Sequence, residues 1–86
     1  MAKVLNINVF NVIYKPEAEG GYTAVVPSLP GCVTYGKDLK EAKKMVGEAI
    51  IVYLASLKKH SESISSDEGT FFSTVNVQSN FFPSFA

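Results

Sequence analysis

Residues 22–36, which read YTAVVPSLPGCVTYG, decide the fold because they place two short apolar segments on either side of a sharp break. Residues 22–26 are rich in strand-favouring side chains and predict a strand. Residues 27–31 interrupt it, and the Pro30–Gly31 pair is a favourable centre for a type II turn. Residues 32–35 then predict another short strand. The stretch therefore predicts two strands joined by a compact connection.

Upstream of this stretch, residues 3–14 are rich in β-branched and aromatic side chains and predict the first strand. Their apolar pattern changes parity after Val9, which either a bulge or a strand covered on both faces explains. Residues 16–21 (PEAEGG) predict a turn, since proline favours its start and two glycines can take positive φ. The first strand is therefore expected to pair with the second as a hairpin.

Downstream, a helix begins after Asp38, a favoured N-cap residue, and Glu41 completes a capping-box pair three residues later. Lys58 and Lys59 lie in the last turn, where the helix dipole favours positive charge. Apolar residues recur at helical spacing and form one stripe for the core. The stripe consists of Leu39, Ala42, Val46, Ala49, Ile50, Tyr53, Leu54 and Leu57.

The remaining residues predict a loop, a strand and a tail. Residues 61–69 are polar, and residues 71–78 alternate apolar and polar side chains as a strand does. The element order is therefore β-β-β-α-β, an α+β fold with an antiparallel three-strand meander and one helix packed on one sheet face. A right-handed crossover places the fourth strand parallel to the third. We expect a single domain over residues 1–78, an apolar C-terminal tail over residues 79–86, and no separate DNA-binding domain.

This layout leaves the sheet face opposite the helix uncovered. Two apolar groups then need cover from another chain: Phe10, Val12 and Tyr14 on the first strand, and Met45, Ile51 and Val52 outside the helical stripe. The alternative is that they are scattered exposed apolar residues, which are common. We expect a homodimer or homotetramer, since a thin core gains stability from association.

Composition narrows the class of protein. Eight basic and eight acidic side chains give a formal net charge of zero, which disfavours direct nucleic-acid binding. The single cysteine, Cys32, suits a reducing cytosol. The longest apolar run, residues 49–55, is far shorter than the roughly 20 residues of a membrane span. We expect a cytoplasmic protein that does not bind membranes.

Residue types that carry catalysis are scarce. His60 is the only histidine, and it is expected to be a solvated residue past the helix rather than a general base. Cys32 is expected to be a buried structural thiol rather than a nucleophile. The chain has no metal-ligand spacing of cysteine or histidine and no glycine-rich phosphate motif. We therefore predict no catalytic residues, no metal and no cofactor.

The pattern Y-x-A-x-x-P-x-L-P-G-C-x-T-x-G over residues 22–36 resembles HicB-type antitoxins. The helix is similar to that family as well, with Glu41-Ala42 early, Glu48-Ala49-Ile50 later, and then Tyr53-Leu54. The pattern is long and irregular, and the resemblance covers about residues 8–60.

This resemblance implies a partial ribonuclease H fold without its active site, together with self-association. It also implies a partner, HicA, a small basic mRNA-cleaving toxin of double-stranded-RNA-binding fold with an essential histidine. Many HicB-type antitoxins carry a C-terminal helix-turn-helix or ribbon-helix-helix domain that binds the operator. No helical pattern for such a DNA-reading element follows His60 here.

A metal-dependent nuclease is the enzymatic alternative, because β-β-β-α-β is the core of the ribonuclease H fold. Such nucleases hold two metal ions with clustered carboxylates, the first of them on strand 1. Residues 3–15 contain no acidic side chain. The sequence therefore favours a protein that is not an enzyme.

Two interpretations remain: an antitoxin that neutralises a HicA-type toxin, or a stand-alone oligomeric HicB-like module with another partner. Acidic side chains facing a basic toxin would steer and orient it. The candidate partner-binding residues are Glu17, Glu19, Tyr22, Tyr35, Glu41, Glu48, Ile51 and Val52. The alternative for the acidic ones is a solvated turn and helix face.

Overall fold

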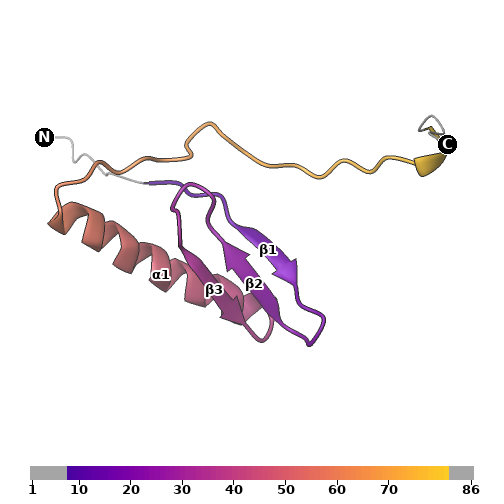
Figure 1. The fold of residues 1–86 in the computed structure, drawn as a ribbon, viewed down its shortest axis with the longest axis horizontal. Coiled ribbons are helices and arrows are strands. Elements are labelled where there is room, and N and C mark those ends of the chain that lie inside the picture. The colour runs from indigo at the N-terminus through magenta and orange to yellow at the C-terminus, as the bar shows by residue number, and fades with distance from the viewer. Residues whose placement is uncertain (1–7, 82–86) are drawn as a thin grey trace, which may run out of the picture.

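The computed structural model describes residues 8–81, which contain a three-stranded antiparallel sheet with a helix on one face (Figure 1). The strands are β1 (Ile13–Pro16), β2 (Tyr22–Val25) and β3 (Val33–Gly36), and they lie in the order β1-β2-β3. Helix α1 (Leu39–Lys59) follows β3, and a short 3-10 turn occupies Ser79–Phe81. The predicted α+β class, the meander and the single-sided helix are confirmed.

The connection between β2 and β3 has the predicted turn. The Cys32 N–H donates to the Leu29 carbonyl at 2.9 Å, and Gly31 has φ of 83°. A positive φ at the third residue of a four-residue turn is the type II geometry, which glycine adopts without strain. The Val26 N–H donates to the Cys32 carbonyl at 3.1 Å and so closes the loop at its base. Residues 22–36 therefore fold as one hairpin.

The N-terminus of α1 is capped as the sequence predicts. Asp38 Oδ1 accepts from the Glu41 N–H at 2.8 Å, and Glu41 Oε1 accepts from the Lys37 N–H at 2.9 Å. The first bond satisfies a backbone donor that has no partner inside the helix. The second is a variant of the predicted capping box, because Glu41 reaches the N–H of Lys37, one residue before the N-cap, instead of that of Asp38. The helix start is therefore fixed directly after β3.

The core lies between α1 and the sheet. Ala42 and Val46 are the buried residues of the helix, and Gly36 lies so close to the Ala42 backbone that a Cβ there would overlap it. Further along the helix, half-buried residues of the predicted stripe, such as Ile50 and Leu54, pack against the buried cluster that includes Val46. The fully buried side chains are Ala24, Val26, Leu29, Cys32, Ala42 and Val46.

The prediction of a first strand over residues 3–14 is wrong in its extent. Residues 1–7 lie outside the described part, residues 8–12 are not a strand, and β1 occupies Ile13–Pro16. The reason is that β2 ends at Val25, where the chain enters the loop before β3. Residues before Ile13 therefore have no strand to pair with on that side.

The prediction that Phe10, Val12 and Tyr14 need cover from another chain is also wrong. All three are half-buried and pack against the chain's own core. Tyr14 pairs with Ala24, which is buried beneath the helix, and paired residues point to the same face of a sheet. Side chains alternate along an extended chain, so Phe10 and Val12 face the helix as Tyr14 does. The parity change after Val9 therefore marks where the chain enters its own core.

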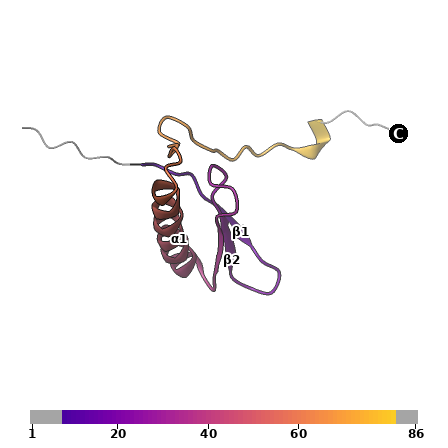
Figure 2. The ribbon, with the colours of Figure 1, turned by 60° about the vertical axis from the view of Figure 1, so that its left-hand side comes forward.

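The fourth strand predicted at residues 71–78 is not formed in the structure. These residues, here called the C-terminal arm, are all exposed and have no regular secondary structure. The arm leads away from the sheet and helix (Figures 1 and 2). As a result the radius of gyration is 17.4 Å, against about 12 Å for a compact chain of this length. Of the predicted tail, residues 82–86 lie outside the described part.

The close contact at Gly36 gives a stability prediction. Gly36→Ala should lower the free energy of unfolding by about 1–3 kcal/mol, because the helix must move to admit the added methyl group. Gly47→Ala is the matched control: it lies inside α1 with open space around its Cβ position, so it should gain about 0.5–1 kcal/mol. Thermal unfolding followed by circular dichroism measures both. Equal effects of the two substitutions would contradict the packing described here.

Candidate functional site

The turn between β1 and β2 presents two of the predicted acidic residues on a rigid backbone. The Glu17 N–H donates to the Gly21 carbonyl at 2.9 Å, and the Gly20 N–H donates to the Glu17 carbonyl at 3.0 Å. The Thr23 hydroxyl donates to Glu17 Oε1 at 2.5 Å, and the Tyr35 hydroxyl donates to the Gly20 carbonyl at 2.8 Å. We call Glu17, Glu19 and Tyr35, which line a shallow hollow here, the acidic turn.

The two tyrosines of the prediction lie on opposite faces of the sheet. Tyr35 pairs with Thr23, whereas Tyr22 pairs with Gly36. Since successive residues of a strand alternate in direction, Tyr22 shares the helix side with buried Ala24, and Tyr35 faces the other side. The structure therefore joins Tyr35 to Glu17 and Glu19 and separates Tyr22 from them.

The sheet face opposite α1 is open among the described residues. In Figure 2 the sheet is seen nearly edge-on, with the helix on one side only. Ile13, Val33 and Tyr35 are exposed on this open face, and Tyr35 is 52% exposed despite its hydrogen bond. The open face thus adjoins the acidic turn and presents apolar side chains beside negative charge.

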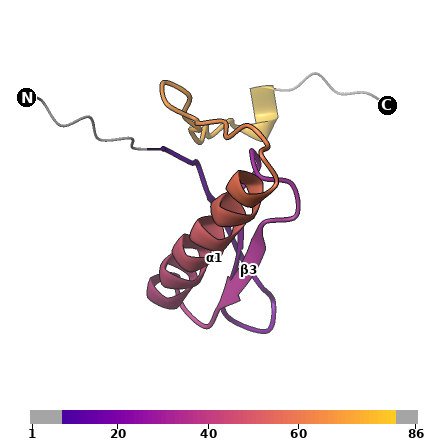
Figure 3. The ribbon, with the colours of Figure 1, turned by 90° about the vertical axis from the view of Figure 1, so that its left-hand side faces the viewer.

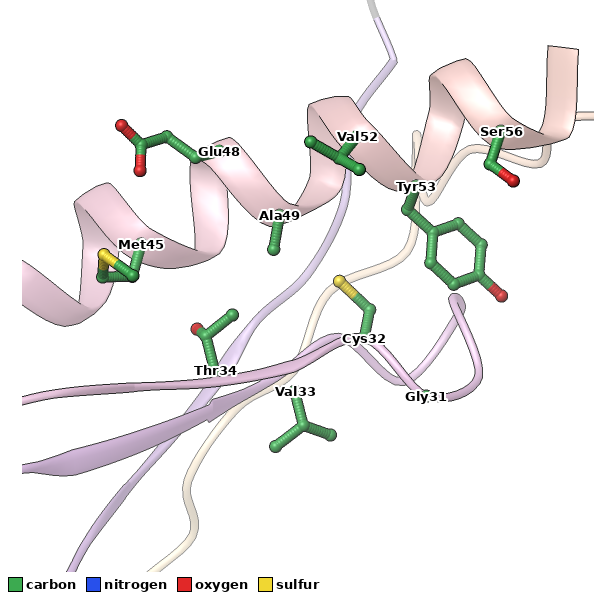
Figure 4. A pocket seen from close by; sticks show the side chains of 10 residues that line it. All are labelled: Gly31, Cys32, Val33, Thr34, Met45, Glu48, Ala49, Val52, Tyr53 and Ser56. Atoms are coloured by element: carbon green, nitrogen blue, oxygen red, sulfur yellow. The ribbon is translucent and has the colours of Figure 1, made fainter. Parts of the chain in front are cut away.

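A second surface is an apolar groove of about 520 Å³ between α1 and the β3 segment. Met45, Ala49 and Tyr53 extend from the helix towards Cys32 and Thr34 (Figure 4). Glu48, Val52 and Ser56 lie along its helical rim, and Gly31 and Val33 complete the lining. Figure 3 shows β3 behind the helix. We call this surface the α1–β3 groove.

The floor of the α1–β3 groove combines an inert thiol with an unpaired hydroxyl. Burial raises the pKa of the Cys32 thiol, which lowers the thiolate fraction on which reactivity depends. Thr34 Oγ1 is buried and has no hydrogen-bond partner among the described residues. The Tyr53 hydroxyl, by contrast, donates to the Pro30 carbonyl at 2.9 Å and ties the helix to the loop. The groove therefore suits packing rather than chemistry.

A third feature, which the sequence analysis missed, is a polar junction around Asp67. Its carboxylate accepts from the Ser28 hydroxyl at 2.5 Å and from the Asn11 N–H at 2.9 Å. Its own N–H donates to the Val9 carbonyl at 2.6 Å, and the Asn11 side chain donates to the Thr70 carbonyl at 2.8 Å. These bonds join three segments and fix the point from which the C-terminal arm departs.

The predicted partner-binding residues fall into separate places. Glu17, Glu19 and Tyr35 share the acidic turn, and Glu48 and Val52 border the α1–β3 groove. Ile51 is 69% exposed on the helix. The Glu41 carboxylate is already engaged in the helix cap, and Tyr22 is half-buried on the helix side. The structure therefore offers two candidate surfaces instead of one.

The α1–β3 groove left a signal in the amino-acid sequence, whereas the Asp67 junction did not. Met45 and Val52 stand outside the helical stripe, which is a visible signal for an extra apolar surface on α1. Asp67, however, bonds to residues 56 positions and 39 positions away. No local pattern reveals such contacts, because a serine-rich loop looks the same whether or not it is anchored.

Within residues 8–81 no group of three histidine, cysteine, aspartate or glutamate side chains is arranged to hold a metal ion. The same residues include no helix long and apolar enough to cross a membrane.

The sequence is similar to that of known proteins over most of its length. Residues 10–81 match the family described as HicB_like antitoxin of bacterial toxin-antitoxin system. The chain belongs to the HicB-like antitoxin family. This HicB-like chain is 48% identical to a UPF0150 protein of Thermoplasma acidophilum over 67% of its own length and 84% of that protein. It is 43% identical to a UPF0150 protein of Archaeoglobus fulgidus, over 62% and 75% of the two chains.

A third relative extends the comparison to bacteria. A UPF0150 protein of Helicobacter pylori is 36% identical over 69% of this HicB-like chain and 82% of its own length. The family match includes Asp67 and the C-terminal arm as well as the sheet and helix. The resemblance found in residues 22–36 is therefore confirmed, and it extends beyond residue 60.

The Asp67 junction predicts a pH-dependent contact. Hydrogen bonds from Ser28 and from the Asn11 N–H lower the pKa of the Asp67 carboxyl below its ordinary value. Because the folded pKa is depressed, the contact is complete above the ordinary pKa and is lost as pH falls through the folded value. The junction should therefore open only below about pH 4.

Nuclear magnetic resonance of the Asn11 amide measures this opening. Its chemical shift should change with acid in the wild type, whereas Asp67→Asn should show altered shifts and no such transition. Glu68→Gln, which changes the neighbouring exposed carboxylate, should behave as the wild type. A transition that persists in Asp67→Asn would contradict the assignment.

Proposed function

We propose that this chain is an antitoxin that binds and neutralises a small mRNA-cleaving toxin of the HicA type. The observation that carries the proposal is the match of residues 10–81 to the HicB-like antitoxin family. In this proposal the chain is not an enzyme, uses no metal or cofactor, and acts in the cytoplasm beside its toxin. Neutralisation occurs by covering the toxin's active surface.

The acidic turn is the surface that best fits a basic partner. Glu17 and Glu19 are exposed on a turn whose backbone is held by hydrogen bonds. A rigid charged loop loses little entropy on binding, and opposite charge speeds the encounter of two proteins. Because the chain as a whole has no net charge, the negative electrostatic potential is confined to the neighbourhood of the turn. The turn therefore supplies orientation.

The open sheet face next to the acidic turn supplies apolar contact area. Tyr35 and Val33 are exposed there, and because they are two residues apart on β3 their side chains lie on the same face. Tyrosine is among the residues that contribute most to binding energy in protein interfaces, and charged residues at the edge contribute mainly to rate. We propose that Tyr35 anchors the toxin and that Glu19 lies at the rim.

A second candidate function is a stand-alone oligomeric module with a different partner. The exposed C-terminal arm and the α1–β3 groove favour this candidate, because both suit self-association without any toxin. The two candidates differ in one respect that is simple to measure, namely whether a toxin is bound.

Co-expression with the short reading frame beside this gene tests the antitoxin proposal. The proposal predicts that the two proteins co-purify and that the chain restores the growth of cells producing the toxin. A neighbouring protein that is toxic yet neither binds nor is neutralised would contradict it. The absence of any toxic neighbour would favour the stand-alone module.

A charge reversal tests the role of the acidic turn. Glu19→Lys should lower the association rate constant for the toxin by about threefold or more at low salt, because steering depends on charge. Glu62→Lys, at an exposed position past the helix, is the matched control and should change the rate little. Stopped-flow mixing at two salt concentrations measures both. Equal effects of the two reversals would remove the acidic turn from the interface.

A further inference from the structure

The two edges of the sheet are protected to different degrees. The outer edge of β1 contains Lys15 and Pro16, and proline has no N–H to offer a further strand. The sequence of β3 is Val-Thr-Tyr-Gly, with neither charge nor proline. Charged residues and prolines are the usual means by which edge strands avoid pairing. The edge of β3 is therefore open to an added strand.

Backbone geometry identifies the groups at this open edge. The Val26 N–H bonds to the Cys32 carbonyl, and residues that bond to a neighbouring antiparallel strand alternate. Thr34 is thus directed to β2, while the N–H and carbonyl groups of Val33 and Tyr35 point outward. A strand laid along β3 would find these groups at the regular spacing of a ladder.

The helix extends over the place that such a strand would occupy. Met45 and Val52 are 40% and 70% exposed, although both line the α1–β3 groove. Leaving these side chains uncovered forfeits hydrophobic stabilisation that an added strand would recover. The groove therefore has the shape expected where a further strand would lie beside β3, and none of the described residues fills it.

The C-terminal arm has the sequence expected of the missing strand. Phe71, Val75 and Val77 lie on one parity together with Ser73, and the other parity is mainly polar. Phe71 and Val75 are 81% and 76% exposed. Alternation of this kind gives a strand one apolar face for a core and one polar face for solvent.

We propose that the C-terminal arm of one copy adds as a strand to β3 of a second copy, with its apolar face in the second copy's α1–β3 groove. The arm already leads away from its own sheet, from a point fixed by the Asp67 junction (Figure 1). Its eight residues span roughly 26 Å when extended, which is enough to cover all of β3.

The two surfaces complement each other in polarity. Phe71, Val75 and Val77 meet Met45 and Val52, and each apolar group covers the other. Ser73 lies on the same face of the arm, and serine paired with threonine across strands is a favourable contact. The buried, unpaired Thr34 hydroxyl on the groove floor lies on the matching face of β3.

Reciprocal exchange buries enough surface for a stable dimer. A phenylalanine contributes on the order of 150–250 Å² when buried, and each arm directs one, Phe71, into the groove together with Val75 and Val77. With the valines, the exposed groove side chains that they cover and the paired backbone, two arms approach the roughly 1,200 Å² typical of small specific interfaces. The second copy is favoured over another protein because every copy carries both halves of the contact. This inference does not depend on the antitoxin proposal.

Light scattering after size-exclusion chromatography of the full chain at micromolar concentration tests the proposal. The wild type should be a dimer. Val75→Asp, which places a charge in the groove, should weaken the dimer by about tenfold or more. Asn76→Asp introduces the same charge one residue away on the polar face and should leave the dimer intact. Val77→Asp is a second arm variant, in case Val75→Asp does not fold.

Mixing separates arm exchange from other modes of association. Val52→Asp damages the groove and should also give monomers. An equimolar mixture of Val75→Asp and Val52→Asp retains one intact arm and one intact groove, so it should form heterodimers. A monomeric wild type, as expected if the arm folds on its own sheet, would overturn the proposal. So would equal effects of Val75→Asp and Asn76→Asp, or a mixture that stays monomeric.

Discussion

Helix α1 approaches the end of β3 so closely, at Gly36 and Ala42, that only a glycine fits in the strand. This contact fixes how close the helix lies to the sheet, and the hydrogen bonds of Asp38 and Glu41 at the helix start fix where α1 begins after β3. One turn on, Val46 joins Ala24 in the buried cluster of the core. The helix covers one face of the sheet only (Figure 2), so the open face and the α1–β3 groove follow from where it lies.

Much of this arrangement could be predicted from local sequence. The type II turn at Pro30–Gly31, the hairpin and the helix cap each depend on residues a few positions apart, and each is found in the structure. The extent of the first strand was beyond such reasoning, because it depends on where β2 ends. Similarly, the cover of Phe10 and Val12 depends on the path of the helix. Local patterns specify elements, whereas contacts between distant elements decide their lengths.

The candidate surfaces were predicted less completely than the fold. Glu17, Glu19 and Tyr35 do come together, because β3 pairs with β2 and the Tyr35 hydroxyl donates to the Gly20 carbonyl in the turn. Tyr22 does not join them, since strand register places it on the other face. Asp67 carried no local signal, although it holds the C-terminal arm in place. The arm has the alternation of a strand but no strand partner among the described residues, which is why the sequence predicted a fourth strand that the single chain does not form.

We propose different surfaces for different partners: the α1–β3 groove for a second copy, and the acidic turn for a toxin. Hydrogen exchange of backbone amides, measured by mass spectrometry with and without the toxin, tests this division most directly. We predict slow exchange in residues 71–78 and 33–35 in both samples, and slower exchange in residues 17–21 only when toxin is added. Fast exchange of residues 71–78 in both samples, or no change in residues 17–21, would contradict it.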